Sequence, residues 1–128
     1  MGKYSFKLQT LLNVKKQMEN NVKNELGVKI THLNKEKELL NSYINKKELY
    51  INNLNENNTR KTNIGQIILY NNYIKGVCEE INIQNECVKK SKYTVEKTRE
   101  RLIEASKEKQ ILEKLDEKEF AENKYNNL

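Results

Sequence analysis

A seven-residue repeat in the second half of the chain constrains the fold more than any other feature. Apolar side chains recur without a break at Ile67, Ile74, Ile81, Val88, Val95 and Leu102. The same spacing continues in polar form at Lys109 and Asp116. A companion row lies three residues further on, at Tyr70, Val77, Gln84, Ser91, Thr98, Ala105 and Leu112. Two such rows are typical of a coiled-coil helix, here predicted from about residue 65 to residue 123.

The first half of the chain carries a similar but less regular stripe. From residue 30 onward, steps of three and four connect Ile30, Leu33, Lys37, Leu40, Ile44, Lys47, Ile51 and Leu54. Before it, steps of four connect Met18, Val22, Leu26 and Ile30. Repeated steps of four locally unwind a left-handed supercoil. The stripe predicts a helix from about residue 5 to residue 55.

Composition supports a chain that is helical nearly throughout. The 128 residues include no proline, whereas an average chain of this length has about six. A proline inside a helix costs ~3 kcal/mol, so long helices exclude it. Only 36% of the residues are hydrophobic and 33% are charged, which is too little for a globular core but enough for a narrow seam. We therefore expect an all-α fold of two long helices that form an antiparallel coiled-coil hairpin.

The connection between the helices is expected at residues 56–64. The stretch NENNTRKTNIG, residues 55–65, lacks apolar periodicity and is rich in Asn and Thr, which suits a turn. Thr62 or Asn63 is the expected cap of the second helix. One continuous helix is the alternative, and the break in register argues against it. Residues 1–128 are thus expected to form a single coiled-coil domain.

Three tyrosines are expected beside the seam near the turn. Antiparallel pairing places residues opposite each other when their numbers sum to about 121. Tyr43, Tyr50 and Tyr73 each come directly before an isoleucine of the apolar stripes, which places them on the shoulders of the seam. The pairing rule places Tyr50 opposite Tyr73. Two interpretations stay open: the rings cover the seam, or they form a half-exposed patch that docks a partner. The second interpretation rests on the enrichment of tyrosine in binding hot spots.

The sequence contains no recognisable catalytic, cofactor-binding or metal site. It has no Gly-rich phosphate loop and none of the common zinc or hydrolase motifs. The single histidine, His32, has no nucleophile arranged around it, and Cys78 and Cys87 lack metal-ligand spacing. We expect a protein that is not an enzyme, uses no cofactor and takes no small-molecule substrate.

Charge and hydropathy leave two further classes of function open. Lys and Arg number 24 against 18 Asp and Glu, a net charge of +6. A basic hairpin that binds nucleic acid is one alternative, but the positive residues are interspersed with acidic ones, which disfavours it. A generic coiled-coil scaffold is the other. The sequence has neither an apolar stretch of about 18 residues nor a secretory signal, so we expect a cytoplasmic protein.

Three segments together resemble the FliJ family of the flagellar type III export apparatus. They are YSFKLQTLLNVKKQMENNVKNEL at 4–26, ILYNNYIKGVCEEI at 68–81 and KTRERLIEASKEKQILEKLDEKE at 97–119. The resemblance implies an antiparallel two-helix coiled coil similar in shape to the central stalk of rotary ATPases. It also implies a non-enzymatic cytoplasmic protein, peripheral at the cytoplasmic face of the flagellar base, that associates with the membrane only through partners.

The resemblance implies three partners. The end that bears the termini would insert into the flagellar export ATPase hexamer and stimulate it, through Phe6, Leu8, Leu11, Leu12, Ile111, Leu112 and Leu115. The export-gate membrane protein would bind nearer the turn, through Tyr43, Tyr50, Tyr73 and Val77. Other positions of the family's gate surface hold different residue types here, at Leu39, Tyr43, Lys46, Glu80 and Gln84. Export chaperones are the third partner.

Overall fold

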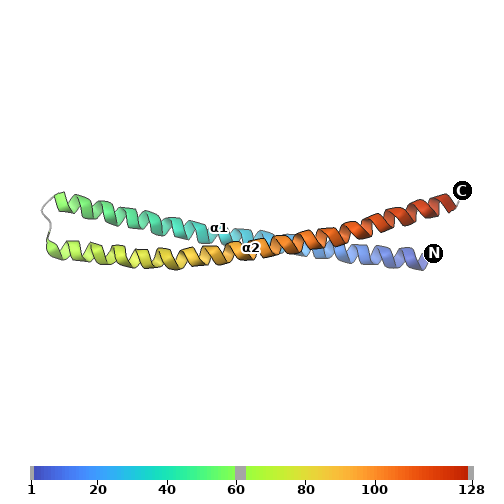
Figure 1. The fold of residues 1–128 in the computed structure, drawn as a ribbon, viewed down its shortest axis with the longest axis horizontal. Coiled ribbons are helices and arrows are strands. Elements are labelled where there is room, and N and C mark those ends of the chain that lie inside the picture. Colours follow the sequence, from blue (N-terminus) through green and yellow to red (C-terminus); the bar gives the residue numbers. More distant parts are fainter. Residues whose placement is uncertain (1, 60–62, 127–128) are drawn as a thin grey trace. The chain divides into compact units, whose positions relative to one another are not determined.

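Two long antiparallel helices make up the fold. A computed structural model describes the backbone of residues 2–59 and 63–126 and the side chains of residues 6–56 and 63–125. Helix α1 spans Gly2–Thr59 and helix α2 spans Ile64–Asn126 (Figure 1). The expected all-α helical hairpin is confirmed. Of the expected connection, residues 60–62 lie outside the described residues.

Both helices extend a few residues beyond their expected bounds. The expected bounds, residues 5–55 and 65–123, were set by where the apolar repeat stops. The flanking segments contain Lys and Glu, which favour a helix without adding to its apolar stripe. The apolar repeat therefore marks the extent of packing more closely than the extent of the helix.

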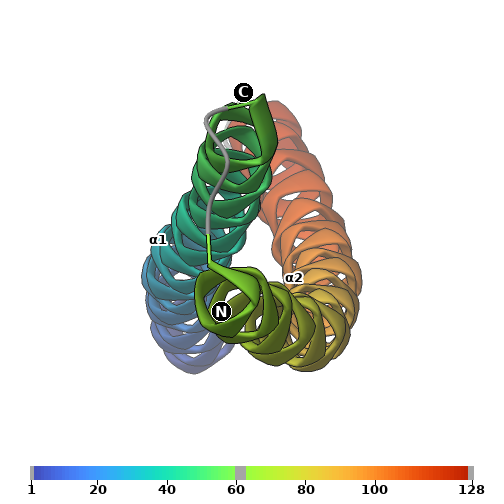
Figure 2. The same cartoon turned by 90° about the vertical axis from the view of Figure 1, so that its left-hand side faces the viewer.

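The chain divides into two compact units, each built from a segment of both helices. The terminal unit consists of Met1–Lys29 and Thr94–Leu128, and the turn unit consists of Ile30–Tyr93. Within each unit the α1 segment packs against the α2 segment along a single seam. In the turn unit the last described turns of α1 lie beside the first turns of α2 (Figure 2).

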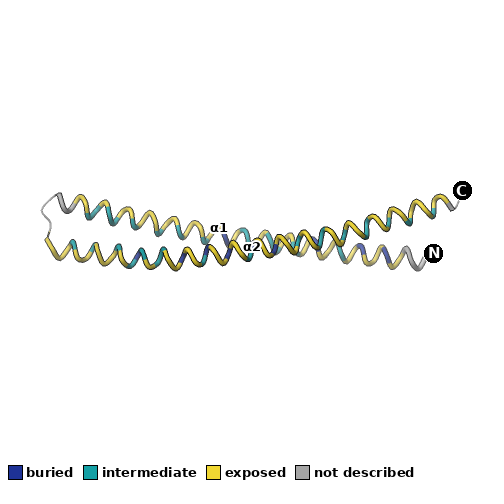
Figure 3. The backbone as a smooth tube through the Cα atoms, in the orientation of Figure 1, coloured by how far each residue is buried: buried dark blue, intermediate teal, exposed yellow. Residues whose placement is uncertain are grey.

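The seam of α2 follows the predicted repeat throughout. Every position of both predicted rows is buried or half-buried, from Ile67 to Asp116. The most deeply buried are Val77 in the turn unit and Val95 and Thr98 in the terminal unit. Buried and half-buried positions recur along both helices in Figure 3. The heptad assignment of the second helix is confirmed.

The seam of α1 lies at different positions from those expected. Leu33, Leu40, Lys47 and Leu54 belong to it, as predicted, and all are buried or half-buried. Met18, Lys37 and Ile44 are exposed, so their assignment to the seam was wrong. The seam is instead completed by Lys15, Glu19, Lys29, Glu36, Tyr43 and Tyr50.

The reason is that polar and aromatic residues occupy many of the seam positions of α1. Once these are included, spacings of three and four run from Leu8 to Leu54 without repeated fours. Long polar side chains line a seam with their alkyl stems while their charged ends reach water or a partner. A search for apolar residues alone therefore assigns exposed residues such as Ile44 to the seam.

Polar residues within the seam are satisfied by hydrogen bonds. In the turn unit, the Gln84 amide donates to the backbone carbonyl of Glu36 at 2.9 Å and also to the Glu36 carboxylate. In the terminal unit, the Thr98 hydroxyl donates to the carbonyl of Thr94 at 2.8 Å. Among the described side chains no buried polar atom lacks a partner, which avoids a cost of about 1–3 kcal/mol per group.

Asn63 caps α2, which confirms one of the two expected caps. Its side-chain oxygen accepts a hydrogen bond from the backbone N–H of Gly65 at 3.1 Å. Its carbonyl accepts the first helical bond, from Gln66, at 3.0 Å. This is the geometry by which an N-cap side chain satisfies a donor that the helix leaves open. The alternative cap, Thr62, lies outside the described residues.

Burial in the seam predicts a large difference between two leucines of α1 in the turn unit. Leu33 is 9% exposed and Leu49 is 57% exposed. Leu33→Ala leaves a cavity in the seam and should lower the free energy of unfolding by about 2–4 kcal/mol. Leu49→Ala, the matched control, should change it by less than about 0.5 kcal/mol. Denaturant unfolding followed by circular dichroism measures both, and equal losses would contradict the register.

Candidate partner-binding surfaces

The seven residues expected to bind the ATPase divide into two groups in the terminal unit. Leu8 and Leu12 are buried and Leu112 is half-buried, so all three pack in the seam. The other four are exposed: Phe6, Leu11, Ile111 and Leu115. These four form the exposed subset that a partner reaches without opening the seam.

An open apolar groove joins four of the seven residues. It has a volume of about 290 Å³ and is lined by Lys7, Leu8, Leu11, Leu112 and Leu115. Leu11 and Leu115 stand at its surface, above Leu8 and Leu112 in the seam. Phe6 and Ile111 are not part of its lining.

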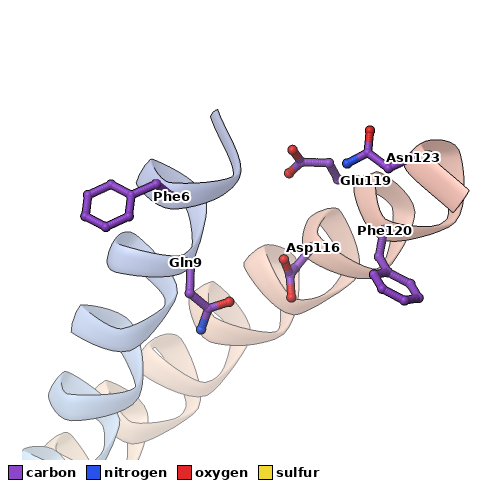
Figure 4. A pocket seen from close by; sticks show the side chains of 6 residues that line it. All are labelled: Phe6, Gln9, Asp116, Glu119, Phe120 and Asn123. Atoms are coloured by element: carbon purple, nitrogen blue, oxygen red, sulfur yellow. The ribbon is translucent and has the colours of Figure 1, made fainter. Parts of the chain in front are cut away.

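A second hollow lies nearer the helix ends of the terminal unit (Figure 4). Its volume is about 500 Å³, and it is lined by Phe6, Gln9, Asp116, Glu119, Phe120 and Asn123. In Figure 4, Gln9 points toward α2 and Phe6 points away from it. Phe120 is exposed, and sequence reasoning missed it. The available signal was an aromatic residue outside both heptad rows in a segment otherwise dominated by charge.

Ion pairs across the seam fix the two helices of the terminal unit. Lys109 contacts Glu19 at 3.1 Å, and Glu19 is buried. Lys15 contacts Glu108 at 2.9 Å. These pairs join residues far apart in sequence, so they hold one register of α1 against α2.

Two of the carboxyl groups in this unit have lowered pKa values. A hydrogen bond from Ser106, followed by one from Lys109, lowers the pKa of Glu19, and burial opposes the shift. A hydrogen bond from Arg101, at 2.7 Å, lowers the pKa of Glu25 and raises that of Arg101. Both carboxylates are therefore more stable as anions in the folded chain than in the unfolded one.

Three tyrosine rings cluster in the turn unit. The ring centroids of Tyr50 and Tyr73 are 5.4 Å apart, which confirms the expected pairing. Tyr70, which sequence reasoning assigned only to the seam, completes the cluster at 6.4 Å from Tyr50 and 6.0 Å from Tyr73. The Lys46 ammonium lies 5.9 Å from the Tyr50 ring centroid. Aromatic pairs at such distances each contribute about 0.5–1.5 kcal/mol beyond area burial.

The tyrosines differ in accessibility. Tyr43 and Tyr50 are half-buried. Tyr73 is 45% exposed and stays on the shoulder. Val77 is only 2% exposed and packs in the seam. The rings therefore both cover the seam and leave one accessible edge at Tyr73, while the assignment of all four residues to a gate-binding surface stays a prediction.

Residues 4–126 match the family described as flagellar FliJ protein. The chain belongs to the FliJ family. Nearly the whole chain is covered by the match, including both seams. FliJ proteins are components of flagellar protein export and flagellum biogenesis, and this chain takes its general role from them. Comparisons with curated proteins and with solved structures gave no match.

The part of the chain that the structure describes contains neither a metal-binding cluster nor a membrane-spanning helix. No group of three or more His, Cys, Asp or Glu side chains is arranged to hold a metal ion. No helix there is long and apolar enough to cross a membrane.

The Glu19 network predicts acid-sensitive folding. Because its folded pKa lies below the ordinary value of 4.5, Glu19 stabilises the fold above that pH. The stabilisation is lost as the pH falls through the lower folded pKa. Glu19→Gln should lower the free energy of unfolding by about 1–2 kcal/mol at pH 7 and flatten its decline between pH 5 and pH 3. Denaturant unfolding across this range, with the exposed Glu104→Gln as control, measures the effect; parallel curves for Glu19→Gln and the unaltered chain would contradict it.

Proposed function

We propose that this FliJ-family protein is a non-catalytic stalk that inserts the end of its terminal unit into the flagellar export ATPase ring. It stimulates turnover there and couples the ring to the export gate and the export chaperones. The observation that carries the proposal is the set of exposed apolar side chains on both helices of the terminal unit: Phe6, Leu11, Ile111, Leu115 and Phe120. Exposed apolar residues gathered in one region are typical of interaction sites.

The groove supports insertion as the mode of binding. Leu11 and Leu115 come from different helices and line the same groove. A ring subunit that fills the groove therefore contacts both helices at once. Beneath it, Leu8 and Leu12 are buried in the seam, and the Glu19–Lys109 pair further along fixes the register. The end of the terminal unit therefore presents an apolar surface whose position is fixed by the seam beneath it and by this ion pair.

The proposed mechanism is allosteric. A protein shifts the states of an ATPase only by binding one state more tightly than another. The two helices differ around this end: α1 contributes Phe6 and the neutral Gln9, whereas α2 contributes Phe120 together with the acidic residues Asp116 and Glu119. A surface without symmetry meets the subunits of a symmetric ring in unequal ways, and this inequality is what biases their nucleotide states.

The turn unit is the proposed site for the export gate. Its accessible aromatic edge, Tyr73, is held by Tyr50 and Tyr70, which lowers the entropy lost on binding. The export chaperones are proposed partners on the family resemblance alone. Binding to these partners would place the protein at the cytoplasmic face of the flagellar base.

A matched pair of isoleucines on α2 tests the ATPase contact. Ile111 in the terminal unit is 60% exposed and Ile83 in the turn unit is 66% exposed. Ile111→Asp should reduce the stimulation of the cognate export ATPase about tenfold or more, because it buries an unpaired carboxylate in the contact. Ile83→Asp should leave stimulation unchanged. ATP turnover with one equivalent of each variant is the measurement, with helicity checked by circular dichroism. Equal stimulation by both variants, with an assembled and active ring, would contradict insertion at this end.

A matched pair of tyrosines tests gate binding. Tyr73 is 45% exposed, and Tyr93, on the same helix of the turn unit, is 65% exposed. Tyr73→Ala should weaken binding to the cytoplasmic part of the cognate gate protein about tenfold or more, and Tyr93→Ala should not. Isothermal titration calorimetry gives both affinities. An undiminished affinity for Tyr73→Ala would remove this residue from the surface.

A further inference from the structure

Each helix carries a feature that weakens helical structure close to the boundary between the two units. On α1 the terminal unit ends at Lys29, and on α2 it begins again at Thr94. Gly27 lies in the last turn of α1 before this boundary, and Thr98 lies just after it on α2. Both residues belong to the terminal unit.

Gly27 is not required by packing within the chain. It lies in the interior of α1 and is exposed, and a Cβ added there would meet no heavy atom within 4 Å. Alanine favours a helix more strongly than glycine does, so Gly27 lowers stability without adding a contact. Glycine has access to more φ and ψ values than any other residue. The backbone of α1 is therefore easier to bend at Gly27 than in the turns on either side.

A threonine supplies the corresponding feature on α2. The Thr98 hydroxyl donates a hydrogen bond to the backbone carbonyl of Thr94, four residues earlier, at 2.8 Å. In an α-helix the backbone N–H of residue 98 bonds to the same carbonyl, so two donors share one acceptor. Such bonds slightly destabilise a helix and often bend it. Thr98 is only 3% exposed, so water does not compete for the bond.

The seam of α2 is only half apolar on both sides of the boundary. The companion row of the heptad repeat holds the polar residues Gln84 and Ser91 in the turn unit and Thr98 in the terminal unit, and all three are buried. The buried apolar residues here come from the other row alone, at Val88 and Val95. Apolar burial is the main force between the helices, so they are held together less firmly here than where both rows are apolar.

We propose that Gly27 and Thr98 form a hinge at which the terminal unit and the turn unit change direction relative to each other. A bend in one helix alone would strain the packed seam, whereas a weak point in each helix allows both to bend together. The hinge lets the turn unit reorient toward one partner while another partner holds the terminal unit. It does not depend on which partners bind, so its test is independent of the proposed function.

Distances between spin labels across the boundary test the hinge. Lys16→Cys in the terminal unit and Glu38→Cys in the turn unit place labels at exposed positions of α1, about 33 Å apart along a straight helix. Gln66→Cys and Lys89→Cys place labels about 35 Å apart on α2, within the turn unit. Both native cysteines are first replaced by alanine. Double electron–electron resonance should give a distance distribution about twice as wide for the first pair as for the second.

Three further substitutions separate a local bend from general helix stability. Gly27→Ala should remove about half of the excess width across the boundary, and its combination with Thr98→Val should remove most of it. Gly76→Ala is the matched control, because a Cβ added to this glycine inside α2 also meets no heavy atom within 4 Å. Gly27→Ala and Gly76→Ala should both raise the melting temperature by about 3 °C through helix propensity. Only Gly27→Ala should narrow the distribution.

Three outcomes would overturn the hinge. The first is an equal width for the two label pairs before any helix substitution. The second is a wide distribution across the boundary that Gly27→Ala and Thr98→Val leave unchanged, since the bend would then lie elsewhere. The third is equal narrowing by Gly76→Ala and Gly27→Ala, which would show that helix propensity along the whole chain, and not a local bend, determines the width.

Discussion

Packing along a seam between two helices, within each unit, is the constraint on which the rest of this protein depends. Among the described residues, every buried apolar side chain belongs to a seam: Leu8, Leu12 and Val95 in the terminal unit, and Leu33, Val77 and Val88 in the turn unit. Two helices have no other mutual contact to offer, so any apolar residue outside the seam stays in water unless a partner covers it. Stability and partner binding are consequently divided between neighbouring positions on the same helices.

The polar residues of the seam give this packing its register. An all-apolar seam tolerates sliding by a turn, because one leucine fits much like another. Glu19 with Lys109, and Glu36 with Gln84, form pairs that are satisfied only when the two helices lie in one alignment. Removing one member of a buried charged pair leaves the other without compensation. Alignment in turn decides which exposed side chains of α1 and α2 stand next to each other at the binding surfaces.

The repeat of α2 was predictable from the sequence residue by residue, because apolar side chains, most of them β-branched, occupy one row of its seam from Ile67 to Leu102. The repeat of α1 was not, because Lys15, Glu19, Lys29 and Glu36 lie on the seam and look like surface residues in the sequence. The antiparallel pairing of residue numbers correctly predicted that Tyr50 lies opposite Tyr73. It did not reveal Tyr70 in the cluster or which predicted leucines are accessible, since accessibility depends on how far each residue is rotated from the seam.

The tyrosine cluster also gives the molecule an optical property. The chain has seven tyrosines and no tryptophan, so ultraviolet emission comes from phenol rings without transfer to an indole within the chain. Three of the seven are packed within 6.4 Å of one another in the turn unit, and Tyr125 is exposed in the terminal unit. A tryptophan brought by a bound partner would accept energy from nearby tyrosines. A loss of native tyrosine emission would therefore report that approach without a label.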